Sequence, residues 1–116
     1  MLFRSRRGDA TLGYALIDVH TVRTLPEALM IVLDPKGEVR SLRVLAFHEP
    51  SDYLPPEGWF RQFEGRGLDS DLQLKGGIHA IAGATLSSRA VTRSVRRTLA
   101  LYEVLIAATD PDTAAE

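Results

Sequence analysis

The apolar positions of the chain form several short runs and one long helical stripe. Residues 13–20 read as a strand, and a second apolar run covers residues 27–33. That run ends at Asp34-Pro35-Lys36-Gly37, a turn sequence in which proline presets φ and glycine accepts a positive φ. Apolar and polar residues then alternate over 38–46, so residues 27–46 are predicted to form a β-hairpin beside the first strand.

The second half of the chain predicts two helices. Proline at its first turn and three aromatic residues on one face favour a short helix at about 56–64. A glycine-rich connection follows over 64–78. A longer helix is predicted at about 87–105, with Ser87 or Ser88 as its N-cap. Its apolar stripe consists of Val91, Val95, Leu99, Tyr102 and Ile106, widened by Ala90, Thr98 and Leu105.

These elements predict an α+β fold, in which a small antiparallel sheet packs against a short and a long helix. The expected organisation is a flexible N-terminus at 1–10, one domain at 11–107 and a flexible tail at 108–116. A chain of 116 residues with 45% apolar residues is large enough for one core.

Composition excludes several classes of site and partner. The chain has no cysteine, which rules out disulfides, iron–sulfur clusters and thiolate zinc sites. Its net charge of −1 gives no overall attraction to nucleic acid or anionic membranes. No apolar run is long enough to span a bilayer, and the basic N-terminus lacks the apolar stretch of a signal peptide.

The residues around the start of the long helix carry the candidate chemistry. Gly83 and Ala84 allow a close approach to the backbone, and the first amides of a helix favour an anion. Thr85, Ser87 and Ser88 add hydroxyl groups there. This pattern is compatible with a phosphate site, although serine and threonine before a helix also serve as simple caps.

The segment Ala82-Gly83-Ala84-Thr85-Leu86-Ser87-Ser88 closely resembles the flavinylation motif of FMN-binding domains in Rnf- and Nqr-type electron-transport complexes. The resemblance implies that FMN is the cofactor. It also implies that a magnesium-dependent flavin transferase esterifies the FMN phosphate to the Thr85 oxygen. The residues expected to contact the cofactor beside Thr85 are Gly83, Ala84, Leu86, Ser87 and Ser88.

Two further segments resemble the same family. Phe47-His48-Glu49-Pro50 is similar to its acidic loop, which implies that His48 and Glu49 lie near the cofactor. Trp59-Phe60-Arg61-Gln62-Phe63 is similar to its Trp-x-x-Gln-Phe helix, with Trp59 expected in the core. The chain departs from the motif at His79, where the family has aspartate, and at Ala82, where it has serine or threonine. Non-covalent FMN in the same pocket is therefore the alternative to covalent attachment.

The implied function is an electron carrier that passes electrons between redox partner proteins. The family resemblance favours an extracytoplasmic location, with membrane association only through partners or a further segment. A flavin oxidoreductase with its own substrate is a second hypothesis. A nucleic-acid-binding module is a third, based on the helix face of Arg89, Arg93, Arg96 and Arg97, but the domain is not basic overall. The three histidines are too scattered in the sequence to predict a metal site.

Overall fold

A single open antiparallel sheet forms one layer of the molecule. The computed structural model describes residues 2–8, 10–69, 72, 77–79 and 84–107. Within them, four strands follow one another in the order β1-β2-β3-β4, and each strand pairs with its neighbour in the sequence. The strands are β1 (Leu2–Arg7), β2 (Ala10–Thr21), β3 (Pro26–Leu33) and β4 (Val39–Phe47).

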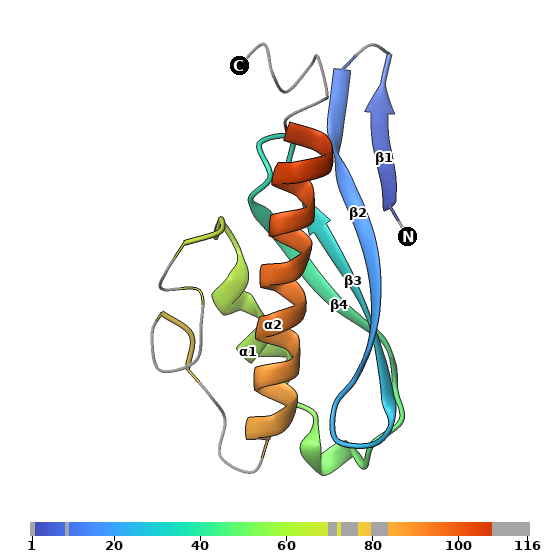
Figure 1. The fold of residues 1–116 in the computed structure, drawn as a ribbon, viewed down its shortest axis with the longest axis vertical. Coiled ribbons are helices and arrows are strands. Elements are labelled where there is room, and N and C mark those ends of the chain that lie inside the picture. The colour runs from blue at the N-terminus through green and yellow to red at the C-terminus, as the bar shows by residue number, and fades with distance from the viewer. Residues whose placement is uncertain (1, 9, 70–71, 73–76, 80–83, 108–116) are drawn as a thin grey trace.

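Helices cover one face of this sheet. The long helix α2 (Thr85–Tyr102) runs along the sheet, and α1 (Glu57–Phe60) lies beside it (Figure 1). A 3-10 turn, Arg61–Phe63, continues α1 and packs against β4. A second 3-10 turn, Ser51–Tyr53, follows β4, and a π-helical turn, Glu103–Ala107, follows α2. The predicted α+β class and both predicted helices are confirmed, although α2 begins two residues earlier than expected.

The predicted hairpin is formed by β3 and β4. The Asp34 carboxylate accepts hydrogen bonds from the amides of Lys36 and Glu38, at 2.9 and 3.0 Å. Gly37 has φ 87°, and a Cβ atom there would overlap the ring of Tyr102. Glycine is therefore required at this position both by the backbone and by the helix that packs on the turn.

The N-terminal residues differ from the expectation of a flexible segment. Residues 2–7 form β1, which pairs with residues 10–16 of β2. The sequence of this strand, Leu-Phe-Arg-Ser-Arg-Arg, lacks the apolar alternation by which a strand is recognised. Its order comes from backbone hydrogen bonds to the edge of β2, which residue patterning does not reveal. The predicted flexible tail at 108–116 lies outside the described residues.

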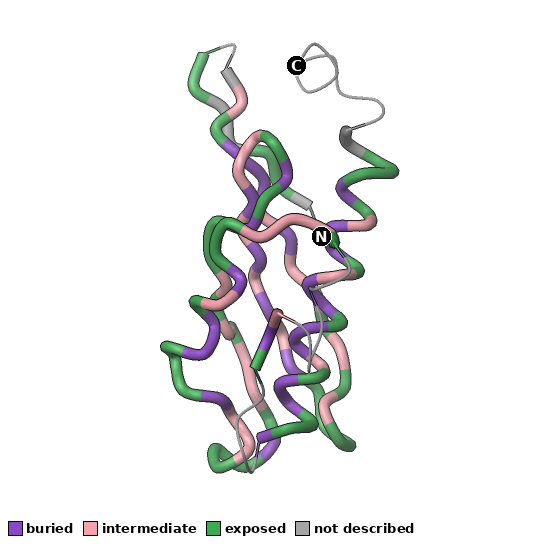
Figure 2. Tube along the Cα trace, turned by 90° about the vertical axis from the view of Figure 1, so that its left-hand side faces the viewer, coloured by how far each residue is buried: buried purple, intermediate pink, exposed green. Residues whose placement is uncertain are grey.

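The core lies between the sheet and α2, where Figure 2 shows buried residues on the facing sides. Leu29, Ile31 and Leu33 of β3 are fully buried, and Val91 and Val95 of α2 pack in the same cluster. Leu99 and Tyr102 of the predicted stripe are also buried, and the side chain of Ile106 lies outside what the structure describes. Trp59, Phe60 and Phe63 close one side. Leu105 was expected in the stripe but is 59% exposed, because the α-helical spacing ends at Tyr102 and a π-helical turn follows.

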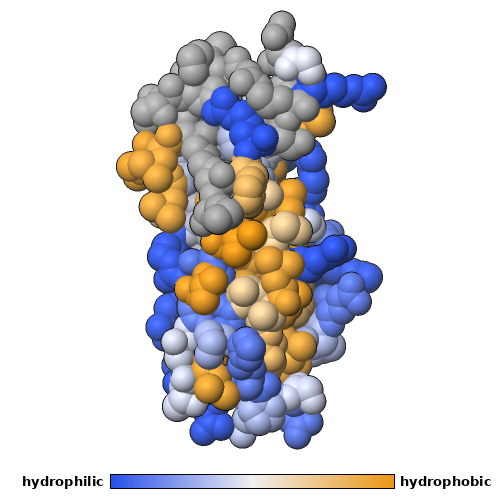
Figure 3. All heavy atoms as spheres, turned by 90° about the vertical axis from the view of Figure 1, so that its right-hand side faces the viewer, coloured by the Kyte–Doolittle hydropathy of each residue, from blue (hydrophilic) through white to orange (hydrophobic). Residues whose placement is uncertain are grey.

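The other face of the sheet is also largely apolar. Alternation along β2 and β3 turns a second set of side chains away from α2, and the register pairs Ala15 with Val32, Ile17 with Met30 and Val19 with Ala28. Val19 is 66% exposed. A hydrophobic band runs along this side of the molecule (Figure 3). Among the described residues, no helix is both long and apolar enough to cross a membrane.

The buried stripe of α2 gives a stability prediction. Val95→Ala or Leu99→Ala should lower the free energy of unfolding by about 2 to 4 kcal/mol, because each leaves a cavity in a packed core. Val104→Ala, at a position that is 67% exposed, is the control and should change it by less than about 0.5 kcal/mol. Denaturant unfolding measures all three. Equal, small losses would mean that α2 does not pack as described.

Candidate functional site

Thr85 is the first residue of α2, and its side chain is exposed. The preceding residue, Ala84, is the N-cap and is buried. The Ser88 amide donates to the Ala84 carbonyl at 2.9 Å, which is the first bond of the helix. The helix has no side-chain cap and no acidic residue in its first turn. The amides of Thr85, Leu86 and Ser87 therefore precede the internal bonding of the helix and favour an anion.

The two serines after Thr85 are buried inside the first turn, so neither is the N-cap that the sequence predicted. Ser88 Oγ donates to the Ala84 carbonyl at 2.8 Å. Ser87 Oγ is buried and has no hydrogen-bond partner among the described residues. Leu86 is 48% exposed, and Gly83 lies outside the described residues. Among the hydroxyl groups expected at this site, the Thr85 hydroxyl belongs to an exposed residue. The Ser87 hydroxyl, in the same turn, is buried and unsatisfied.

The segment before the motif is held by a side-chain clamp from α1, which supplies Trp59, and from the 3-10 turn that continues it, which supplies Gln62. Gln62 Oε1 accepts from the His79 amide at 2.7 Å, and Gln62 Nε2 donates to the His79 carbonyl at 3.3 Å. The indole N–H of Trp59 donates to the same carbonyl. Trp59 is 4% exposed, as expected of a core residue, and its indole N–H has a hydrogen-bond acceptor in the His79 carbonyl. The family resemblance included Trp59 and Gln62, but the sequence did not predict their hydrogen bonds to the His79 backbone.

Glu49 has a structural task in the acidic loop. Its Oε2 accepts hydrogen bonds from the amides of Arg23, Thr24 and Leu25, at 2.8, 2.9 and 3.3 Å. The amide of Thr24, with those of Arg23 and Leu25, holds the pKa of Glu49 below its ordinary value. The carboxylate therefore ties the loop after β4 to the β2–β3 loop. His48 next to it is exposed.

Three segments that are distant in the sequence meet at one end of the molecule. The start of α2, the β2–β3 loop and the loop after β4 lie together in Figure 1, and the 3-10 turn after β4 contacts α2. Thr85, Leu86, His48 and Glu49 thus belong to the same end. The fold brings the two resemblance-based groups of residues to one region, as a shared cofactor site requires.

A charged network that the sequence did not reveal connects this end to the middle of the sheet. His20 Nε2 contacts Glu27 Oε1 at 2.7 Å, and His20 Nδ1 contacts Asp18 Oδ2 at 2.9 Å. Ser94 Oγ and an Arg97 guanidinium nitrogen donate to the same Asp18 oxygen, at 2.6 and 2.7 Å. Glu27 is fully buried. His20 and Glu27 are cross-strand partners, so only the register of the β2–β3 hairpin could have identified the pair.

The network shifts the pKa values of two of its members. Burial by itself would lower the pKa of His20, but hydrogen bonds to Glu27 and Asp18 outweigh it and raise that pKa above the ordinary value. Burial by itself would raise the pKa of Asp18, but hydrogen bonds from Ser94, His20 and Arg97 outweigh it and lower that pKa. When it is protonated, His20 can donate a hydrogen bond to Asp18 from Nδ1 and to Glu27 from Nε2.

The four arginines of α2 do not form one free face. Arg96 donates to the carbonyls of Asp69 and Leu72, at 3.0 and 2.9 Å, and Arg97 binds Asp18. Arg89 and Arg93 are exposed, and neither has a hydrogen bond or an ion pair with another described residue. The described residues contain no cluster of histidine and carboxylate groups placed to hold a metal.

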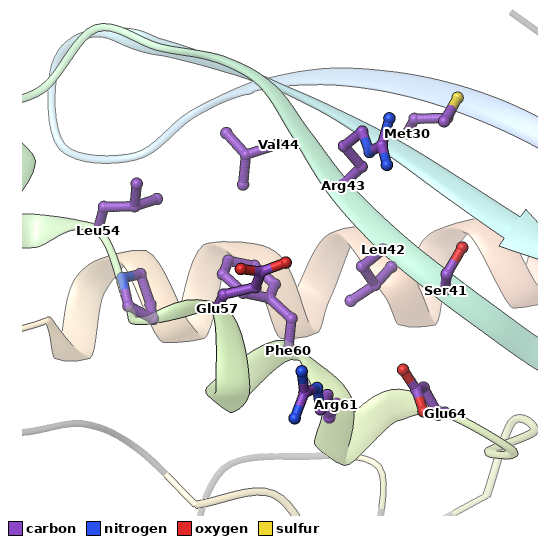
Figure 4. Close-up of a pocket in the computed structure, with 11 residues that line it drawn as sticks. Met30, Ser41, Leu42, Arg43, Val44, Leu54, Glu57, Phe60, Arg61 and Glu64 are labelled. Carbon is purple, nitrogen blue, oxygen red and sulfur yellow. The ribbon is translucent and has the colours of Figure 1, made fainter.

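A larger cavity, of about 650 Å³, lies on the other side of the core, between β4 and α1 (Figure 4). Leu42, Val44, Leu54 and Phe60 form its apolar part, and its charged residues include Arg61. Of the residues expected to contact FMN, none of those that the structure describes lines it.

Comparison with known proteins gives one family. The family model described as FMN-binding domain matches residues 26–100, which include β3, β4, both helix starts and the Thr85 segment. No curated protein matches the chain.

The His20 network gives a pH prediction. A raised pKa means that protonated His20 stabilises the fold fully below the unfolded pKa of about 6.5, and that this stabilisation is lost as the pH rises through the folded-state value. The free energy of unfolding should therefore fall from about pH 6 to pH 8. His20→Gln should flatten that dependence, whereas His48→Gln, at an exposed position, should keep it. A wild-type profile that rises over this range would contradict this role of protonated His20.

Proposed function

The chain belongs to the FMN-binding domain family, and we propose that it is an electron carrier whose FMN is esterified through its phosphate to Thr85. The observation that carries the proposal is the exposed Thr85 at the start of α2, where the first turn has neither a side-chain cap nor an acidic residue. A phosphodiester on Thr85 keeps one negative charge next to those amides, which is the placement that a helix start favours.

The residues of the first turn fit a flavin phosphate. Ala84 is buried and has a side chain of one methyl group, so it does not extend over the exposed Thr85. The amides of Leu86 and Ser87 can donate to phosphate oxygens. The buried Ser87 hydroxyl, which has no hydrogen-bond partner among the described residues, is a further polar group in this turn. Ser88 keeps its bond to the Ala84 carbonyl and serves the helix itself.

Attachment would be a phosphoryl transfer from an activated flavin donor to the Thr85 hydroxyl. The Thr85 Oγ–H bond breaks, and an Oγ–P bond forms with the flavin phosphate of an activated donor. The bond from phosphorus to the donor's anhydride oxygen breaks, and the leaving group departs with its electron pair. The threonine proton passes to a base of the transferase or to water, and no oxidation or reduction takes place.

When bound, FMN supplies the redox chemistry, and the protein supplies position and electrostatics. The Gln62 clamp fixes the backbone at His79, six positions before Thr85 in the chain. Glu49 holds the β2–β3 loop against the same end. His48, exposed on the loop after β4, is a neighbouring side chain available to face the flavin. Redox partner proteins and a flavin transferase are the partners that this function requires.

The attachment site is tested by mass. Intact protein co-expressed with a flavin transferase should gain the mass of one FMN minus water and retain its flavin after denaturation. Thr85→Ala should abolish this gain, and Thr85→Ser should retain part of it because the hydroxyl remains. Thr24→Ala, an exposed threonine at the same end of the molecule, is the matched control and should be modified like the wild type. A modified Thr85→Ala protein would place the ester elsewhere.

His79 decides between covalent and non-covalent FMN. The motif has aspartate at this position, and the clamp fixes the backbone from which the exposed His79 side chain extends. His79→Asp should therefore increase the fraction of protein that carries covalent flavin in the same co-expression. His48→Asp places the same acid nearby and should not. If wild-type protein stays yellow after dialysis but loses all flavin on denaturation, FMN is bound without the ester.

A further inference from the structure

A small groove follows the N-terminal half of α2 on the side that faces the end of β2. Its volume is about 100 Å³, the size of one carboxylate or phosphate group with its first contacts. Arg89, Arg93 and Arg97 lie four residues apart, so their side chains share one side of the helix. His20 and Thr21 at the end of β2, Val22 in the loop that follows, and Leu86 and Ala90 of α2 complete its lining.

The positive charge of this groove is only partly neutralised. Asp18 pairs with Arg97, and His20 lies between Asp18 and Glu27. Arg89 and Arg93 have no acidic partner among the residues that the structure describes. Like charges four residues apart destabilise a helix, and arginine near a helix start opposes the helix dipole. Stability of α2 therefore does not account for these two arginines.

The distribution of charge over the whole chain identifies the kind of partner. Helix α2 contains four arginines and no acidic residue, and the rest of the chain contains 10 basic and 15 acidic residues. A long polyanion such as nucleic acid would be attracted by α2 and repelled by its surroundings. A short acidic patch on a protein can contact the groove without reaching the acidic surroundings that would repel it. We infer that the groove of Arg89, Arg93, Arg97 and His20 is the docking site for an acidic surface of a redox partner protein.

The position of the groove suits electron transfer. Arg89 is one helical turn from Thr85, a rise of about 6 Å along the axis. Leu86, which follows Thr85, lines the groove. A partner held by the arginines would therefore lie close to a flavin on Thr85. The identity of the partner as a redox protein rests on the proposed function, whereas the binding of an acidic peptide by the groove does not.

The test uses the full chain expressed without a transferase, so that it does not depend on flavin. An N-acetylated hexaglutamate peptide is titrated into ¹⁵N-labelled protein at low salt, where the Debye length is on the order of 20 Å. Saturable shifts should be confined to the amides of residues 20–22 and 86–97. Raising the salt to physiological strength should weaken binding by about tenfold.

Two double variants that each remove two positive charges distinguish binding in the groove from a general attraction of the peptide to the charge of the protein. Arg89→Gln/Arg93→Gln should reduce the peptide affinity by about tenfold or more. Arg43→Gln/Arg61→Gln removes two exposed arginines at the cavity between β4 and α1, and should reduce it by less than about twofold. All four positions are exposed, so thermal unfolding should show that both variants remain folded.

Three results would overturn the inference. One is an equal loss of affinity in the two double variants, and another is a set of shifts outside the groove. The third is equal or tighter binding of inorganic phosphate or of a short DNA duplex, which would make the groove a small-anion or a nucleic-acid site. Because no flavin is present, a failure here leaves the Thr85 proposal standing, and a failure of flavinylation leaves the groove result unchanged.

Discussion

The start of α2 favours an anion, and the described residues place no acidic side chain in its first turn. Its amides precede the internal bonding of the helix, its N-cap is an alanine, and no acidic residue lies in the turn. Arginines follow at 89 and 93, which adds positive charge to the positive end of the dipole. In an ordinary surface helix each of these features would be unfavourable. They become favourable together when a phosphate is fixed to the first residue.

The rest of the fold holds this turn in place. The core between β3 and α2 fixes the axis of the helix, because Val91, Val95 and Leu99 pack on fully buried strand residues. The side chains of Trp59 and Gln62 fix the backbone of His79, and Glu49 fixes the loop on the opposite side. Long side chains that bind backbone groups thus hold two segments near the start of α2, the one at His79 and the β2–β3 loop, while Thr85 remains exposed.

The sequence predicted the parts of the fold that depend on local signals. The hairpin of β3 and β4 was predicted because Asp34-Pro35-Lys36-Gly37 separates two apolar runs, and α2 because its stripe repeats at helical spacing. Strand β1 was missed because its order comes from backbone pairing. The His20–Glu27 contact was missed because it depends on strand register, and the serines were misplaced because the helix starts at Thr85. The importance of Thr85 came from resemblance, since hydroxyls near a helix start usually indicate a cap.

Phosphorus NMR of the flavin on this protein tests the central claim most directly. A phosphomonoester has a second pKa of about 6, so the ³¹P resonance of non-covalent FMN can shift with pH around that value. A phosphodiester has no such ionisation. For protein matured with a flavin transferase, we expect one bound-flavin resonance that stays constant from about pH 5 to pH 8 and that is absent from Thr85→Ala protein. A resonance that titrates with a midpoint near 6 would contradict attachment through the phosphate.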